Sequence, residues 1–500
     1  MESSDLSYYQ FLQHTAQTMG AHPALISPER TVSHQEYLTA VDGLANGLHQ
    51  KGLSSGDRVC ILANNSIEYF ELFGACARLG AVAYPINWRL SPEEIQQILA
   101  LAEPKAVVVD APNLEKIASL EMETASIRAL IGDDSVQGFE PLASMSSADA
   151  DSTTSVDSND AFVILTTAAT EGVPRGAVLS HANLLTAGQQ IVQQLELTSG
   201  DRHLAALPLF HVTGLGLALA TLLAGGANVV LERFDPAAAA GFMDQHQVTL
   251  MASFPPVLAM LLDARTASEA SWKSLKYVLG LDAPDVIQRL MTETKAQFWT
   301  GFGQSETSGV VTLGNVIEKP GAAGKSLPAA EVRIFDEHGT AVPTGSKGEI
   351  VVRGPLVFKE YWRDPDASSF VSRHGWHHTG DMGSIDEEGY LFYLGRKPEK
   401  DLIKSGGENV YPAEVEYVIE SLPQVKAVCV IGVTDEKWGE AVKAIVELEP
   451  GESLTSDDIT KAVVDRIAAY KKPRSVEFVD ALPRTEDHEI DRQAVKAAYG

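Results

Sequence analysis

The sequence predicts an α/β protein with a large N-terminal domain and a small C-terminal domain. Short apolar runs, such as residues 57–64 and 81–87, alternate with segments of helical spacing, such as residues 66–80. This alternation is typical of mixed or parallel sheets covered by helices. The pattern changes after residue 394, and a chain of 500 residues exceeds the size that one hydrophobic core usually supports.

The change of pattern predicts three segments. Residues 1–394 would form the large domain, residues 395–401 a hinge rich in Gly, Pro and charge, and residues 402–500 a small α+β domain. In the small domain we expect one helix that begins at Pro412 and a second helix that is capped by Thr455.

Charge and cysteine content limit the expected partners and location. The formal net charge is −28, so bulk electrostatics do not favour binding to nucleic acid or to an anionic membrane surface. Cys60, Cys76 and Cys429 lie in apolar runs and are expected to be buried, reduced thiols. We find no signal-like N-terminus and no apolar run of roughly 18 residues, which favours a cytoplasmic protein without a membrane span.

A loop of small residues within residues 164–184 follows an apolar run and precedes a helix-like segment. It contains hydroxyls, flexible glycines and a permanent cation, at Thr166, Thr167, Thr170, Gly172, Arg175 and Gly176. Loops of this composition can surround phosphate oxygens. A plain strand–turn–helix would have the same pattern, so both interpretations stay open.

This loop resembles the phosphate loop of the AMP-forming adenylate-forming superfamily, which includes acyl-CoA synthetases, peptide-synthetase adenylation domains and luciferase. The family form is close to TSGTTGxPKG, and residues 167–176 read TAATEGVPRG. The resemblance implies a luciferase-like fold and implies that Thr167, Thr170 and Gly172 contact the nucleotide. Arg175 would act as the catalytic cation in place of a lysine.

The loop also departs from the family pattern. Ala168 and Ala169 remove a hydroxyl and a glycine, and Glu171 adds an acid beside the expected pyrophosphate. The resemblance nevertheless extends over residues 10–495, with the motifs in the expected order.

Two further motifs imply contacts to the acid and to the nucleotide. In LPLFHVTGLG, His211 would lie near the acyl carboxylate, with plain packing as the alternative. In WTGFGQSETSG, Phe302 would stack on adenine, Ser305 would contact the α-phosphate, and Glu306 would hold Mg²⁺. Magnesium commonly binds through few carboxylates together with substrate phosphates, which agrees with that role. A solvated surface carboxylate is the alternative for Glu306.

The stretch GWHHTGDMGSIDEEGYLFYLGRKPEKD gives the most specific match. Its Asp381 would hold the ribose hydroxyls, and a carboxylate can accept hydrogen bonds from both hydroxyls of a diol. Arg396 would be a second ribose and phosphate contact. Asp282, in the sequence GLDAP, would lie on the adenine side of the site. A turn aspartate and an ordinary surface arginine are the structural alternatives for the first two.

The stretch KSGGENVYPAEVE implies a coenzyme A channel. Gly406 and Gly407 match a loop that lines this channel, where side chains would obstruct the pantetheine, whereas a bare turn is the alternative. Asp401 best matches the hinge residue, although Pro398 and Glu399 look inserted before it.

Taken together, the motifs predict an AMP-forming carboxylic acid–CoA ligase that uses ATP, Mg²⁺ and coenzyme A. The acid would form an acyl-adenylate and pyrophosphate, and a thiol would displace AMP after the small domain rotates. A small aliphatic or aromatic monocarboxylate is expected, because the pocket segments show no Arg or Lys for a second carboxylate. The protein could form a homodimer. An adenylating ligase with an amine or carrier-protein acceptor, and a non-catalytic nucleotide or acyl-CoA binding protein, remain as alternatives.

One substitution weakens the usual first step. In LPRTEDHEIDR, Glu489 stands where the family has a lysine that bridges carboxylate and phosphate. Either another cation substitutes, or the first step is slow, or the chain does not turn over. The candidate cations are Lys404, Arg175, Lys496 and protonated His488.

Overall fold

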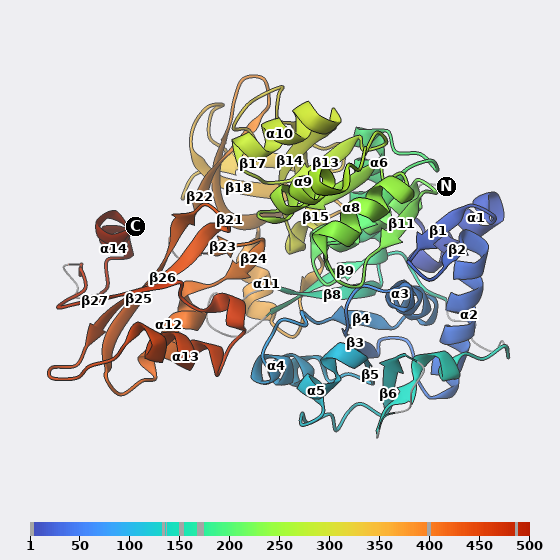
Figure 1. The fold of residues 1–500 in the computed structure, drawn as a ribbon, viewed down its shortest axis with the longest axis horizontal. Helices are drawn as coiled ribbons and strands as arrows, with labels where there is room; N and C mark the ends of the chain where they lie inside the picture. The colour runs from blue at the N-terminus through green and yellow to red at the C-terminus, as the bar shows by residue number, and fades with distance from the viewer. Residues whose placement is uncertain are drawn as a thin grey trace.

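The computed structural model describes residues 5–132, 136, 138–149, 155–167, 175–397, 402–485 and 489–500. Within these residues the strands form four sheets, of which three belong to a large N-terminal domain and one to a small C-terminal domain (Figure 1). The predicted α/β architecture with a large and a small domain is therefore confirmed.

The first sheet of the large domain has the strand order β19-β9-β8-β4-β3-β5-β6-β7 and is mostly parallel. The hairpin β8–β9 and the edge strand β19 are antiparallel exceptions. The strands are β3 (Arg58–Leu62), β4 (Val82–Pro85), β5 (Ala106–Asp110), β6 (Ile127–Ile131), β7 (Glu140–Pro141), β8 (Ala161–Thr167), β9 (Arg175–Ser180) and β19 (Glu360–Tyr361).

The second sheet has the order β16-β15-β14-β13-β12-β10-β11-β1-β2, with a parallel centre from β14 to β1. Its strands are β1 (Pro23–Ile26), β2 (Thr31–Ser33), β10 (Arg202–Ala205), β11 (Ala227–Val230), β12 (Leu250–Ser253), β13 (Tyr277–Gly280), β14 (Gln297–Gln304), β15 (Gly309–Asn315) and β16 (Lys325–Ser326).

The third sheet is antiparallel and carries the segment with the ribose motif. It contains β17 (Glu331–Phe335), β18 (Gly348–Arg353), β20 (Ser372–Arg373), β21 (Trp376–Ile385) and β22 (Leu391–Arg396). The last strand of the large domain thus runs through Arg396.

Helices cover the parallel sheets, as the alternating pattern predicts (Figure 1). They are α1 (Tyr8–Met19), α2 (His34–Gln50), α3 (Ile67–Leu79), α4 (Pro92–Ala102), α5 (Leu114–Ile117), α6 (His181–Leu195), α7 (Val212–Leu223), α8 (Pro236–Gln245), α9 (Val257–Ser268), α10 (Pro284–Thr294) and α11 (Pro365–Val371). Several begin with a serine whose side chain accepts a hydrogen bond from the backbone N–H three residues later, which satisfies a donor that the helix leaves open.

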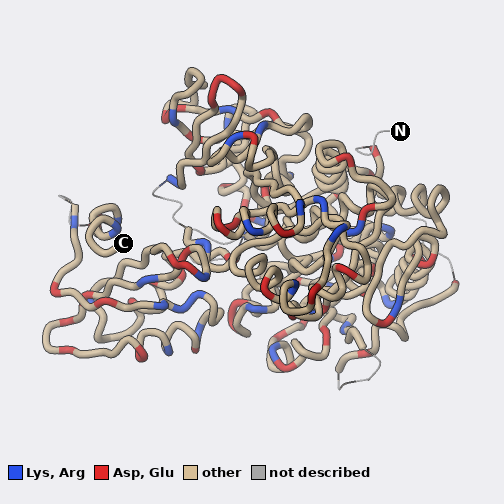
Figure 2. Tube along the Cα trace, turned by 45° about the horizontal axis from the view of Figure 1, so that its top comes forward, with Lys and Arg blue, Asp and Glu red and all other residues tan. Residues whose placement is uncertain are grey.

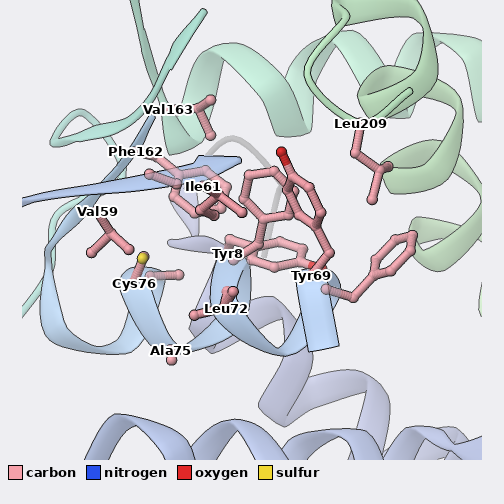
Figure 3. Packing of buried hydrophobic residues seen from close by; sticks show 14 of the residues in the cluster. Tyr8, Val59, Ile61, Tyr69, Leu72, Ala75, Cys76, Phe162, Val163 and Leu209 are labelled. Carbon is pink, nitrogen blue, oxygen red and sulfur yellow. The ribbon is translucent and has the colours of Figure 1, made fainter. Parts of the chain in front are cut away.

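The main core lies where α1, α3 and the first sheet meet (Figure 3). The ring of Phe162 stacks on Tyr8 at a centroid distance of 5.3 Å and on His181 at 4.4 Å. Cys76 packs in the same cluster, and all three cysteines are buried and unbridged, as expected. Burial raises the pKa of the Cys76 thiol to about 12, so this group stays neutral and serves in packing.

The small domain contains one sheet with helices on both faces. Its elements are α12 (Pro412–Glu420), α13 (Ser456–Val464), α14 (Arg492–Tyr499), β23 (Ile403–Ser405), β24 (Glu408–Val410), β25 (Val425–Asp435), β26 (Gly439–Leu448) and β27 (Ser475–Val479). The first helix begins at Pro412, and the Thr455 side chain accepts from the N–H of Asp458, so both predicted helix starts are confirmed.

Acidic and basic residues are distributed along the chain in both domains (Figure 2). Within the described ranges, every helix falls short of the length and apolar character that crossing a membrane requires.

Candidate active site at the carboxyl ends of the central strands

Two of the predicted site segments, residues 280–284 and 299–309, follow neighbouring parallel strands of the second sheet. The strands β12, β13 and β14 pair side by side, and their carboxyl ends lead into Phe254, Asp282 and Ser305. In open α/β sheets, ligands bind at this edge. The sheet therefore brings together segments that lie far apart in the sequence.

Asp381 is the centre of a polar cluster at the edge of this region. Its register partner across β21 and β22 is Arg396, and Arg396 Nε lies 3.1 Å from Asp381 Oδ1. Gln304 Nε2 donates to Asp381 Oδ2 over 2.5 Å, and the hydroxyl of Tyr393 donates to Oδ1 over 3.3 Å. Asp381 is buried, and several donors fix its orientation, as recognition of a diol requires.

An aromatic pair lies next to this carboxylate. The ring centroids of Phe302 and Tyr393 are 6.1 Å apart, with an interplanar angle of 29°. Phe302 is only 7% exposed, whereas Tyr393 is 41% exposed. Most of the aromatic surface that an adenine ring could contact here therefore belongs to Tyr393. The contact of adenine with Phe302 stays a prediction.

Asp282 offers a buried acceptor at the end of β13. Its Oδ1 accepts from the N–H of Ala283, whereas its Oδ2 is buried and has no hydrogen-bond partner within the described residues. Burial raises the pKa of the Asp282 carboxyl, because a charge is poorly solvated there. A ligand amino group would satisfy this oxygen.

Glu306 lies in a short 3₁₀ helix (Ser305–Thr307) directly after β14. The hydroxyl of Tyr361 donates to Glu306 Oε1 over 2.7 Å. Burial, together with the nearby Glu306, raises the pKa of Tyr361, so this hydroxyl stays a donor. Ser305 is partly exposed in the same turn.

Glu306 fits a magnesium site that uses one protein carboxylate. The described residues contain no group of three or more His, Cys, Asp or Glu side chains that could hold a metal. A single carboxylate combined with substrate phosphates is a usual arrangement for Mg²⁺.

Arg175 lies beside Tyr361, the tyrosine that donates to Glu306. Its Nε lies 2.9 Å from Asp364 Oδ2, and its guanidinium carbon lies 5.8 Å from the centroid of the Tyr361 ring. Across the hairpin, Arg175 pairs in register with Thr167. Thr170 and Gly172 lie outside the described residues, as does the predicted hinge residue Asp401.

His211 lies at the start of α7 and contacts the small domain. Its Nε2 is 3.2 Å from Glu408 Oε1, and Arg89 Nη1 is 2.5 Å from the same oxygen. Asn87 Nδ2 donates to the other oxygen over 3.3 Å. Burial opposes ionisation of Glu408, but these partners outweigh it and lower its pKa to about 2. Glu408 therefore stays ionised and joins the two domains.

Gly406 and Gly407 precede Glu408 and lie against the end of β12. Both have positive φ angles, of 60° and 82°. A Cβ on Gly407 would lie 3.1 Å from the Phe254 side chain, and one on Gly406 would lie 2.7 Å from the Trp438 ring. The backbone angles and the close approach both favour glycine here. The loop expected to line the coenzyme A channel thus lies at the carboxyl ends of the strands.

Comparison with known proteins agrees with this arrangement. A family model described as AMP-binding enzyme matches residues 12–362, and the AMP-binding enzyme C-terminal domain matches residues 414–488. The chain belongs to the AMP-binding enzymes.

Relatives of this AMP-binding enzyme match almost its whole length. A feruloyl-CoA synthase from Amycolatopsis sp is 36% identical, covering 97% of this chain and 99% of the relative. An indoleacetate–CoA ligase from Aromatoleum aromaticum is 35% identical, and the match covers 95% of this chain and 94% of the relative.

Solved structures also match. The o-succinylbenzoate CoA synthetase from Bacillus subtilis gives a TM-score of 0.84 at 28% identity, covering 97% of this chain and 98% of that one. The amide bond synthetase McbA from Marinactinospora thermotolerans gives a TM-score of 0.87 at 26% identity, and the match covers 98% of this chain and 99% of that one.

Glu489 lies apart from the other site residues of this AMP-binding enzyme. It is exposed, and its carbonyl accepts from the N–H of Thr485, next to the bridge between Arg484 and Ile490. The following helix, α14, lies at the end of the small domain that points away from the large domain (Figure 1). In this orientation the Gly406–Gly407 loop, and not the terminal turn, faces the strand ends.

Among the cations proposed to replace the missing lysine, Arg175 and Lys404 both lie close to residues of the candidate site. The Lys404 ammonium is close enough to Arg396 and Asp381 for both charges to act on it, and desolvation by neighbouring protein atoms, together with Arg396, lowers the pKa of Lys404, although the residue as a whole is exposed. Lys496 lies in α14, on the far part of the small domain. His488 lies outside the described residues.

Motif reasoning missed several residues of this AMP-binding enzyme that the structure places in the site. Tyr361 and Gln304 hold the predicted carboxylates Glu306 and Asp381. Glu408 lies inside a quoted motif, but its sequence context does not indicate that it reaches His211.

Proposed function

We propose that this enzyme couples ATP cleavage to AMP with the ligation of a carboxylic acid to coenzyme A. The observation that carries the proposal is the approach of the Gly406–Gly407 loop to the strand ends, two residues after Lys404, on which the charges of Asp381 and Arg396 act. Two relatives over nearly the whole chain are named as a CoA synthase and a CoA ligase, which supports the same reaction. ATP and coenzyme A are its substrates.

In this proposal the buried carboxylate of Asp381 binds the ribose diol, and Arg396 lies beside it at the ribose and the phosphate. Asp282 accepts from the adenine, and Thr167, Thr170, Gly172 and Ser305 contact the phosphates. Glu306 would hold Mg²⁺, which when bound screens the negative charge that concentrates on the phosphates. Tyr361 keeps the Glu306 carboxylate in place, and Arg175 contributes a permanent cation nearby.

The second half reaction uses the side of the small domain that faces the site in this structure. Gly406 and Gly407 bring the backbone of this loop close to the strand ends, along which the pantetheine arm would pass. His211 and Glu408 close the neighbouring wall and hold the two domains together. The thiol would release its proton to solvent and attack the acyl carbon, and AMP would leave with the electron pair of the broken acyl–phosphate bond.

Four finer points are also proposals. The acid would be an aliphatic or aromatic monocarboxylate that lies near His211, Asp282 and Gly309. The domain boundaries would be residues 1–394, 395–401 and 402–500, with Asp401 in the hinge. The protein would act in the cytoplasm. The protein would form a homodimer, and sedimentation would measure its oligomeric state.

The test is to incubate the protein with Mg-ATP, coenzyme A and a panel of aryl and aliphatic acids. Acid-dependent release of pyrophosphate and AMP, together with the CoA thioester, is expected. The proposal fails if no acid in a broad panel releases AMP. The likeness to an amide bond synthetase makes an amine the alternative acceptor, and product formation without coenzyme A would favour it.

A further inference from the structure

A buried ion triad joins the large domain to the small domain. Lys471 Nζ lies 2.5 Å from Glu94 Oε1 and 2.5 Å from Glu414 Oε2. Glu94 belongs to α4 of the large domain, whereas Glu414 and Lys471 belong to the small domain. The Lys471 side chain is 6% exposed, so solvent does not screen these contacts.

Glu94 also joins the two domains through the backbone. Its Oε2 accepts from the N–H of Ser91, which closes the capping box of α4, and from the N–H of Ala468 in the small domain, over 2.9 Å. The hydroxyl of Ser91 donates to the carbonyl of Arg466 over 3.0 Å. One carboxylate therefore receives donors from its own helix, from a backbone of the other domain and from a buried ammonium.

Apolar packing accompanies these polar contacts. Ala468 is buried in the same cluster as Ile95 and Leu99 of α4. The chain passes from the large domain to the small domain once, after β22, so contacts of this kind must determine how the small domain is oriented. Removal of one partner from a buried ion pair is strongly unfavourable, because the remaining charge is left without compensation.

We propose that Glu94 is a positioning residue for the coenzyme A step. Its ion pair with Lys471 selects the orientation in which Gly406 and Gly407 lie against the strand ends. The part of this inference that concerns coenzyme A rests on the proposed function, whereas the part that concerns orientation does not.

The orientation is tested by the distance between two spin labels, without any substrate. Glu115→Cys on α5 and Glu452→Cys in the small domain replace exposed residues, and the three native cysteines are buried, so labelling should be selective. The parent protein should show the distance of the described orientation. Glu94→Gln keeps an oxygen for the helix cap but loses the charge. The fraction of molecules that show this distance should fall at least fivefold in the variant.

The matched control is Glu36→Gln. Glu36 occupies the same capping-box position in α2, where Ser33 N–H donates to it over 2.8 Å, and it has no partner in the small domain among the described residues. This variant should leave the distance distribution unchanged. The inference is overturned if the parent lacks the described distance, or if Glu94→Gln retains the parent distribution while thermal unfolding shows that it is folded.

The coenzyme A step is tested in single turnovers with preformed feruloyl adenylate. Glu94→Gln should slow thioester formation at least tenfold and raise the coenzyme A concentration needed for half-maximal rate, whereas Glu36→Gln should match the parent. An unchanged rate in Glu94→Gln overturns the positioning role. If the parent forms no thioester from this adenylate or from those of the acid panel, the proposed function fails, and the label distances still decide the orientation.

Discussion

His211 Nε2 and Glu408 Oε1 lie 3.2 Å apart across the boundary between the two domains. Glu408 also pairs with Arg89, and its low pKa keeps it ionised at any ordinary working pH. The contact joins a residue predicted to lie near the acyl group to the segment predicted to line the coenzyme A channel.

Glu408→Gln should therefore impair the coenzyme A step. Truncation of one partner of a buried, hydrogen-bonded charge pair typically costs about 2–5 kcal/mol, so we expect thioester formation from a preformed acyl-adenylate to slow by at least tenfold. Stopped-flow or quenched-flow assays would measure this rate. Glu436→Gln changes an exposed carboxylate of the same domain and should have no effect. Equal rates of thioester formation in the two variants would show that Glu408 does not contribute to this step.

Glu489→Lys should accelerate the first half reaction. The substitution restores a cation at the position where the family pattern has lysine, and a single well-placed donor can change a rate by about 10²–10³-fold. We expect acid-dependent pyrophosphate release to rise by roughly tenfold or more. Glu452→Lys makes the same charge change elsewhere in the small domain. If pyrophosphate release is unchanged, the turn does not enter the first-step site, or another cation already acts there.

Asp381→Asn should weaken nucleotide binding. The carboxylate is oriented by Arg396, Gln304 and Tyr393, and hydrogen bonds to charged groups contribute about 1.5–3 kcal/mol each. The dissociation constant of AMP should rise by about 10–100-fold, which calorimetry can measure. Asp480→Asn, at an exposed position of the small domain, should leave the constant unchanged. Unaltered AMP binding in Asp381→Asn would contradict the ribose assignment.

Glu71 should make the stability of the large domain depend on pH. Burial, with Glu68 adding to the effect and Arg30 opposing it, raises the pKa of Glu71 from 4.5 to about 7. Between these two values the folded protein holds a proton that the unfolded chain has lost. The free energy of unfolding should therefore fall as pH rises from about 4.5 to about 7, and stay level with respect to this group above that range.

Glu71→Gln should remove this contribution. The fall in unfolding free energy between pH 5 and pH 8 should be smaller by about 1–3 kcal/mol than in the parent, because one pKa unit corresponds to about 1.4 kcal/mol. Urea unfolding at the two pH values would measure it. Glu115→Gln, at an exposed position, should retain the parent slope, and the same slope in Glu71→Gln would contradict the assignment.

Local features of the sequence predicted much of the fold and part of the site. The Pro412 and Thr455 helix starts depend on contacts within one turn, so the sequence around them is sufficient. Asp381 and Arg396 belong to neighbouring strands joined by a short turn. One motif contains both residues, so the sequence was sufficient to predict that they lie close together.

Contacts between distant segments were not predictable in the same way. Tyr361 reaches Glu306 because an edge strand pairs with β9, and no spacing in the sequence indicates that pairing. The bonds of Glu408 and Glu94 depend on the orientation of one domain against the other, which short motifs do not encode. The sequence predicts Arg175 as a catalytic cation near phosphate but does not predict its pairing with Asp364, which lies 189 residues away.

Gly406, Gly407 and Glu408 are consecutive, so the loop at the strand ends and the carboxylate that bonds to His211 move as one piece. The small domain cannot turn away without dismantling the wall along which the thiol would approach. If coenzyme A enters along this wall, as proposed, it would bind only while the domains are joined in this way, and the order of substrate addition would follow from that geometry. Departure of the finished thioester and reopening of the enzyme would be a single kinetic event.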